Sequence, residues 1–273
     1  MSKRLGIDSG LRRNDDTRGF SLIELSIGLV IVGLLTGGIL AGQSLIRAAE
    51  VRSVITDFDK YKTATLQFRQ KFDALPGDFS NAVDTWGAAD PTPATCATTA
   101  SSGQATCDGN EDGRINVSAG SNEYFRFWQH LANAGMIEGQ FNGIQQGATI
   151  WGSTRANTPA GRISNTLWHI QYMGAVASGS IWFDGNYDNT FQVGIQFPDY
   201  DPANPFLKPE EAWNIDTKID DGKPAVGKVV IRAQNGLSTC TTTSSTAIVT
   251  ADYLLSNSNT ACSLLFRNYL LKN

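Results

Sequence analysis

One uncharged run constrains this chain more than any other feature of its sequence. Between Leu25 and Ile46 there are 22 consecutive residues without an acidic or basic side chain. As an α-helix the run would be about 33 Å long, at ~1.5 Å per residue, and the hydrocarbon core of a bilayer is ~30 Å thick. The run therefore predicts one transmembrane helix, because the apolar part of an ordinary secretory signal peptide is shorter.

The segment before this run predicts how the helix is oriented. Residues 1–19 contain five Lys or Arg and three Asp, so their net charge is +2 in a chain whose net charge is −4. Positively charged flanks stay in the cytoplasm, and we expect the residues after Ile46 on the opposite side of the membrane. The remaining residues, at −6, argue against a protein that coats nucleic acid through a broad basic face.

Glu24 is an unusual residue at the start of such a helix. A carboxylate in a membrane helix costs about 2.5 to 3.5 kcal/mol at the bilayer centre, and less near the interface. Glu24 therefore either extends to the polar edge of the membrane or pairs with a positive group of another subunit. The residues alone leave both interpretations open.

The segment RGFSLIEL at residues 18–25, followed by the apolar run, resembles the type III signal of type IV prepilins and type II secretion pseudopilins. The resemblance implies that the prepilin peptidase, a membrane aspartyl peptidase, cuts between Gly19 and Phe20, and that the new terminal Phe20 is N-methylated. It also implies that Glu24 pairs with the terminal amine of a neighbouring subunit during assembly. One difference is that many type IV pilins have a helix-bending proline where this chain has Ala41.

The helix is expected to continue beyond the membrane as an amphipathic stem. Apolar residues recur at helical spacing after residue 47, and charged residues occupy the other face. These apolar residues are Val51, Val54, Ile55, Phe58, Tyr61, Phe68 and Phe72. Pro76-Gly77 is a stop signal. The predicted organisation is a leader at 1–19, a transmembrane helix half at 20–46, an amphipathic helix half at 47–75 and a globular head at 76–273.

The head is predicted to be α+β, with antiparallel strands packed against the long helix, as in pilin-like heads. Residues 123–139 predict a short helix, and strands are predicted at 166–173, 180–183, 190–197 and 228–233. The two histidines, His130 and His169, fall inside these elements. We interpret both as structural residues.

Four cysteines in the head allow three disulfide pairings. Local closure, with Cys96 paired to Cys107 and Cys240 paired to Cys262, is the simplest of them. Disulfides are typical of exported domains. Metal ligation by thiolates is the alternative, but the sequence contains no Cys-x2-Cys spacing.

An acidic loop suggests a metal ion. Asp108, Asn110 and Asp112 alternate along the chain and are followed by Gly113, which resembles the first half of a calcium-binding EF-hand loop. The distal glutamate of that loop is missing, because the twelfth position is Ala119. Ca²⁺ as a cofactor is one prediction, and a polar turn is the alternative.

Two further acidic segments have the same pair of interpretations. Residues 212–231 resemble a stretch in the carboxyl-terminal parts of some pilin-like proteins, and Asp220-Asp221-Gly222 within them predicts a tight turn. The functional alternative is Ca²⁺ coordination by Asp216, Asp220 or Asp221. For residues 184–188 a hairpin turn is favoured over a metal site.

These observations predict a structural protein and not an enzyme, because no hydrolase, P-loop or dinucleotide-binding motif occurs. The chain is expected to be a subunit of a type IV pilus or a type II secretion pseudopilus. It would enter the inner membrane with its leader in the cytoplasm and its head in the periplasm, and then assemble with other subunits into a filament. The alternative is a minor pilin whose head binds DNA or another ligand at the filament tip, although the acidic charge makes nucleic acid an unfavoured partner.

Overall fold

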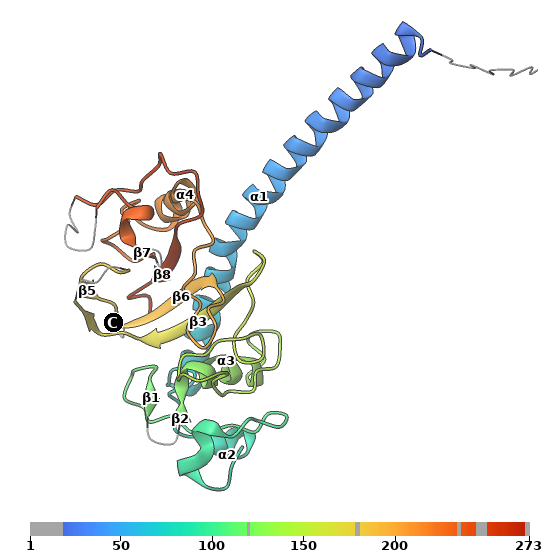
Figure 1. Cartoon of the computed structure of the whole chain (residues 1–273). Coiled ribbons are helices and arrows are strands. Elements are labelled where there is room, and N and C mark those ends of the chain that lie inside the picture. The colour runs from blue at the N-terminus through green and yellow to red at the C-terminus, as the bar shows by residue number, and fades with distance from the viewer. Residues whose placement is uncertain (1–18, 119–120, 178–180, 234–235, 244–249, 271–273) are drawn as a thin grey trace, which may run out of the picture. The chain divides into compact units, whose positions relative to one another are not determined.

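The computed structural model describes residues 19–118, 121–177, 181–233, 236–243 and 250–270. The chain divides into two compact units, residues 1–47 and residues 48–273. Helix α1 (Leu22–Phe72) contributes residues to both units (Figure 1). The two units are described in turn.

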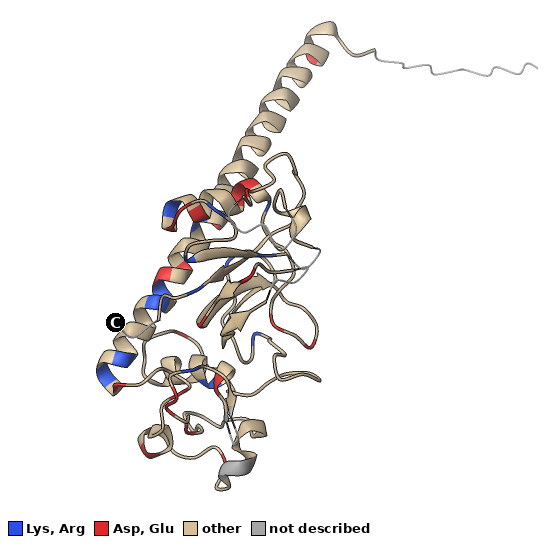
Figure 2. Cartoon of the chain, turned by 90° about the vertical axis from the view of Figure 1, so that its left-hand side faces the viewer, with Lys and Arg blue, Asp and Glu red and all other residues tan. Residues whose placement is uncertain are grey.

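The first unit consists of the apolar half of α1. Its large aliphatic side chains are exposed, and its most apolar window has a mean hydropathy of 2.2. Figure 2 shows that charged residues are sparse along this half of the helix and frequent along the other half. By length and composition, α1 is the one helix in the described residues that could cross a membrane. Exposed apolar surface of this extent indicates a helix that needs a membrane or another apolar partner.

The second half of α1 packs against the sheet of the head. The ring of Phe58 stacks on Phe266 with 4.2 Å between centroids, and Tyr61 meets Trp168 edge-on at 5.4 Å. Phe58 and Phe68 are completely buried. The amphipathic pattern therefore predicted the correct buried face. The helix ends at Phe72, before the predicted stop at Pro76-Gly77, because Asp73 already adopts a left-handed backbone with φ of 53°.

The main sheet has four antiparallel strands in the order β3-β6-β8-β7. The strands are β3 (Thr166–Tyr172), β6 (Asn189–Ile195), β7 (Val229–Arg232) and β8 (Ser263–Phe266). The predicted strands at 166–173, 190–197 and 228–233 correspond to three of them. The predicted strand at 180–183 is wrong in its described part, where only an isolated bridge joins Trp182 to Arg232. Strand β8 lies in a segment where the sequence indicated no strand.

Shorter elements surround this core. They are α2 (Ala82–Trp86), η1 (Pro93–Thr98), β1 (Val117–Ser118), β2 (Ser121–Asn122), α3 (Glu123–Asn133), β4 (Ala175–Val176), β5 (Gly185–Asn186), α4 (Pro209–Ile219) and η2 (Leu237–Thr239). The predicted helix at 123–139 is therefore shorter than expected, and Gly135 follows its end with φ of 71°. A long apolar helix followed by an antiparallel sheet is the predicted α+β, pilin-like architecture.

Candidate functional site

The predicted cleavage point lies immediately before α1. Gly19 and Phe20 are outside the helix, and the side chain of Phe20 is 87% exposed. A peptidase needs an accessible backbone that is not held in a helix. The local structure at this bond meets that requirement.

Glu24 closes the first turn of α1 on itself. The backbone N–H of Ser21 donates to Oε2 of Glu24 at 2.9 Å, and the N–H of Ile23 donates to Oγ of Ser21 at 3.3 Å. Glu24 makes its half of a capping box, while Ser21 accepts from the second helical residue in place of the third, and both bonds satisfy N–H groups that the helix itself leaves without partners. The negative charge of Glu24 also interacts favourably with the positive end of the helix dipole. Sequence reasoning missed this role, although the Ser-x-x-Glu spacing was visible in the sequence.

The capping box also fixes where Glu24 lies relative to the predicted cut. Cleavage after Gly19 would create a terminal amine on Phe20, and Phe20 directly precedes the N–H that Glu24 accepts. The carboxylate is therefore held at the end of the helix where a terminal amine would be.

The comparison with known families agrees with this reading of the amino-terminal segment. Residues 15–40 match the model of the prokaryotic N-terminal methylation motif. This match is consistent with the signal of type IV prepilins and pseudopilins, and it supports a protein of the type IV pilin or pseudopilin class. No significant match was found among curated proteins or among solved structures.

The predicted calcium loop is organised differently from the EF-hand pattern. Oδ1 of Asp108 accepts the N–H of Val83 in α2 at 2.8 Å, and Oδ1 of Asn110 accepts the N–H of Asp112 at 3.1 Å. Carboxylate oxygens of Asp112, Asp78 and Glu123 lie within 4.8 Å of one another, and the predicted partner Asp108 does not belong to this group. The sequence pattern showed alternating oxygens, but the backbone turns their side chains toward different partners.

The acidic group of Asp78, Asp112 and Glu123 holds the loop together by accepting backbone hydrogen bonds. Asp78 accepts from Asp112 and Gly113 at 3.1 and 2.9 Å, and Glu123 accepts from Asn116 at 3.0 Å. Burial raises the pKa of Asp78 to about 6 and that of Glu123 to about 8. These contacts give the group a structural role without a metal ion. Sequence reasoning missed Asp78, which lies 34 residues before Asp112 in the chain, and it noted Glu123 only as an acid four residues beyond the twelfth loop position.

A second acidic group lies at the end of α4. Asp216, Asp220 and Asp221 have carboxylate oxygens within 4.8 Å of one another. Oδ2 of Asp216 accepts the hydroxyl of Tyr253 at 2.8 Å, whereas Oδ1 is buried without a hydrogen bond from the described residues. Burial raises the pKa of Asp216 to about 7, and the charges of Asp221 and Asp220 raise it as well, whereas hydrogen bonds from the Tyr253 hydroxyl and the Gly222 backbone lower it. This group contains the residues that the sequence offered as an alternative calcium site.

The two histidines are structural. Nδ1 of His130 accepts the N–H of Gly77 at 2.9 Å, so Nε2 carries the proton and faces Oγ1 of Thr106 at 2.9 Å. Burial lowers the pKa of His130 to about 3 and that of His169 to about 4. Both are therefore neutral at physiological pH and serve as hydrogen-bonding parts of the core.

The cysteines form two local disulfides, Cys96–Cys107 and Cys240–Cys262. These are the pairings that the sequence spacing makes simplest. The first disulfide fixes the loop beside α3, where Nη2 of Arg126 donates to the carbonyl of Cys96 at 2.9 Å. The second joins the segment after η2 to the segment just before β8. Both therefore close loops that have little secondary structure of their own.

Proposed function

We propose that this chain is a filament subunit of a type IV pilus or a type II secretion pseudopilus. The observation that supports the proposal most strongly is the methylation motif at residues 15–40, which includes the first part of an apolar helix that continues into a folded head. The motif accounts for processing, the apolar half of α1 for anchoring and packing, and the head for the outer surface. None of these features requires an enzymatic site.

In this proposal the chain first enters the inner membrane with residues 1–19 in the cytoplasm and the head in the periplasm. A prepilin peptidase then cuts between Gly19 and Phe20, which removes the positively charged leader, and Phe20 is N-methylated. Subunits leave the bilayer by packing their apolar helix halves side by side. Side chains that are exposed in the single chain are then buried between neighbours, and this burial stabilises the filament.

Glu24 has two successive roles in this proposal. Before assembly its carboxylate caps α1 through the N–H of Ser21. During assembly it pairs with the positively charged amine of a neighbouring Phe20. Opposite charges attract strongly in a low-dielectric surrounding, and a buried charge without its partner is costly. Pairing would therefore favour the one register between adjacent helices in which each carboxylate meets an amine.

Co-expression with a prepilin peptidase tests the processing step. The mass of the chain should fall by that of residues 1–19, and the substitution Gly19→Leu should leave the chain uncut in the same membranes. Phe20→Leu is the matched control, because it changes the other side of the bond and keeps Gly19. Equal cleavage of Gly19→Leu and the unaltered chain would contradict the predicted site.

We also propose that the head binds Ca²⁺ through Asp216, Asp220 and Asp221. Ca²⁺ takes carboxylate oxygens as ligands, and the buried Oδ1 of Asp216 lacks a hydrogen bond from the described residues. A cation would also offset the mutual repulsion of the three carboxylates. Both acidic sets accept backbone hydrogen bonds. The predicted set Asp108, Asn110 and Asp112 is less favoured because all three residues are exposed, whereas the other set includes the buried Asp216.

Thermal unfolding with CaCl₂ or with EDTA tests this proposal, because a ligand that binds only the folded state raises Tm. All six tryptophans lie between residues 86 and 213, so their fluorescence reports on the head. Asp221→Asn should remove the calcium-dependent rise in Tm, and Asp112→Asn, an exposed residue of the other acidic group, should keep it. A Tm that is equal in CaCl₂ and EDTA would exclude the site.

A further inference from the structure

The head contains a cavity of about 670 Å³ that none of the roles described above uses. This volume is within the range of small-molecule sites, roughly 300 to 1,000 Å³. Six aromatic side chains line it. They are Tyr124, Trp151, Tyr172, Trp182, Phe197 and Tyr200.

Three of these rings form a row on one side of the cavity. Trp151 and Tyr200 are almost parallel, with 12° between their planes and 6.4 Å between centroids. Phe197 continues the row, at 5.3 Å and 28° from Tyr200. Tyr200 is 42% exposed, which is high for a large aromatic residue. The three rings stack on one another, and the exposed part of Tyr200 leaves aromatic surface against which another ring can pack.

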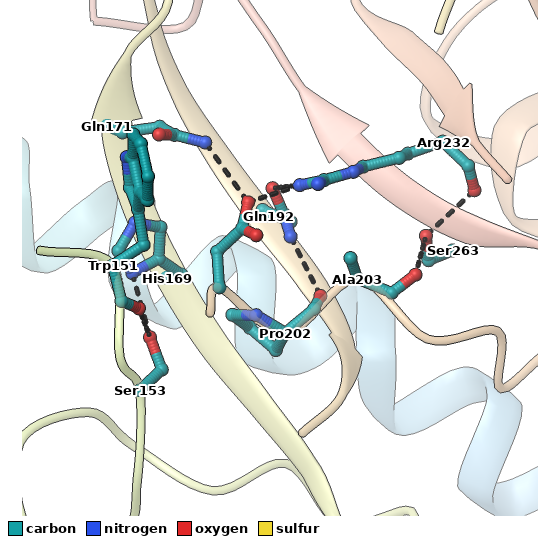
Figure 3. A network of polar contacts seen from close by, with 10 residues as sticks. Trp151, Ser153, His169, Gln171, Gln192, Pro202, Ala203, Arg232 and Ser263 are labelled. Atoms are coloured by element: carbon teal, nitrogen blue, oxygen red, sulfur yellow. Dashed lines mark hydrogen bonds and ion pairs between the residues drawn. The ribbon is translucent and has the colours of Figure 1, made fainter. Parts of the chain in front are cut away.

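The polar floor of the cavity is the buried pair of Asp201 and Arg232. Figure 3 shows the polar network around Arg232, Gln171 and Gln192. Asp201 and Arg232 form an ion pair there, and each is only 6% exposed. Nε2 of Gln171 donates to Oδ2 of Asp201 at 3.3 Å, and Nη1 of Arg232 donates to Gln192 at 2.8 Å. Trp182 lies against the guanidinium, 4.9 Å from Cζ to the ring centroid. The floor is therefore held in place from several sides.

The ion pair leaves one hydrogen-bonding group unused. The bonds that Asp201 accepts from Gln171 and Arg232 both go to Oδ2. Arg232 uses Nη1 for its side-chain bonds, and its Nε is buried without a partner among the described residues. Buried polar groups normally have partners. A carboxylate and a guanidinium with an unpartnered donor therefore both line the aromatic cavity.

We propose that this cavity binds a neutral carbohydrate, with a sugar ring stacked on the row of Trp151, Tyr200 and Phe197 and its hydroxyl groups bonded to Asp201 and Arg232. A pyranose has a face of C–H bonds, which suits the negative face of an aromatic ring. Its hydroxyl groups both donate and accept hydrogen bonds. Adjacent hydroxyls can therefore use the carboxylate and the guanidinium together.

The same contacts speak against other ligand classes. Burial alone would raise the pKa of Asp201, but Arg232 outweighs it and holds that pKa below its usual value, so the pair is ionised and its charges cancel. An anion would meet Asp201 and a cation would meet Arg232. A purely apolar ligand, such as a hydrophobic peptide side chain, would cover Asp201 and Arg232 without forming hydrogen bonds to them, which is unfavourable. A neutral polyol avoids all three costs.

Calorimetry on the full chain tests the inference. The chain is kept in lauryldimethylamine oxide, because detergents with sugar headgroups would compete for the cavity. The probes are short oligomers of glucose, galactose, mannose and N-acetylglucosamine, together with an anionic uronic acid oligomer, a cationic glucosamine oligomer and a hydrophobic tripeptide. At least one neutral oligomer should bind saturably and more tightly than the charged oligomers and the peptide.

Two variants and a matched control locate the binding. Tyr200→Ala and Trp151→Ala should weaken the neutral sugar by at least about tenfold. Trp213→Ala should leave it unchanged, because Trp213 is a similarly exposed aromatic residue, 38% accessible, that does not line the cavity. No binding by any neutral oligomer, tighter binding of a charged probe or of the peptide, or equal loss with Trp213→Ala would each overturn the inference. The cavity lies within the head, so the result does not depend on filament assembly.

Discussion

At the scale of single residues, Glu24 has both a local and an assembly role. Its capping of Ser21 explains why a carboxylate is tolerated at the start of an apolar helix even in a single chain. The proposed pairing with a neighbouring amine needs the negative charge, whereas capping needs only an acceptor oxygen. The two roles can therefore be separated by substitution.

Glu24→Gln should keep the cap and remove the charge, because glutamine also closes a capping box. Glu24→Ala should remove both. We expect both variants to be cleaved after Gly19 and both to be depleted from a sheared filament fraction by about tenfold or more. If Glu24→Gln assembles as well as the unaltered chain while Glu24→Ala does not, capping and not charge pairing explains the residue.

Glu123 gives the head a stability that depends on pH. Its pKa is about 8 in the folded head, mainly because of burial, and lies near the ordinary 4.5 in the unfolded chain. The folded state therefore binds more protons between these values, and stability should rise as pH falls. From pH 8 to 6.5 we expect Glu123 alone to add about 1.6 kcal/mol to the free energy of unfolding.

The measurement is urea unfolding followed by tryptophan fluorescence, with EDTA present throughout. Glu123→Gln should reduce the dependence over this interval, and the part that remains should come mainly from Asp216, whose pKa of about 7 acts in the same direction. The buried histidines act in the opposite direction as the pH approaches 6.5 and falls below it, because the unfolded chain binds protons there while the lowered pKa values keep both histidines neutral in the folded head. An unchanged slope in Glu123→Gln would show that another group titrates.

At the scale of elements, α1 could be predicted because its pattern is local. The uncharged run and the helical spacing of apolar residues lie in consecutive sequence, and the buried face includes Phe58, Tyr61 and Phe68 as expected. Strand β8 was missed because it is short and its identity depends on pairing with β6 and β7, which lie far away in the chain. The acidic groups were only partly predicted for the same reason, since Asp78 and Tyr253 reach them from distant segments.

The packing of α1 on the sheet makes a quantitative prediction. Phe58 is completely buried and stacks on Phe266 at 4.2 Å. Phe58→Ala should destabilise the head by about 3 to 5 kcal/mol, because the change removes buried apolar surface and leaves a cavity. Leu66→Ala on the same helix is the control, since Leu66 is 39% exposed. Comparable urea midpoints for the two variants would mean that this half of α1 does not stabilise the head.

At the scale of the whole molecule, the amino-terminal segment could be interpreted from the sequence alone, whereas the cavity of the head could be recognised only from the fold. The segment that matches the methylation motif is short and contiguous, so its spacing could be read directly from the sequence. The aromatic cavity is built from residues of α3, β3, β4, β7 and several loops, and these segments are spread along the chain from Tyr124 to Arg232. Their side chains became interpretable as one site only through the fold.

The central claim is that the chain is matured as a prepilin. Intact-mass and amino-terminal analysis of the protein from its native membrane tests this most directly. The account predicts a chain that begins at Phe20 and carries one methyl group on its terminal nitrogen. A chain that begins at Met1, or at any residue other than Phe20, would contradict it.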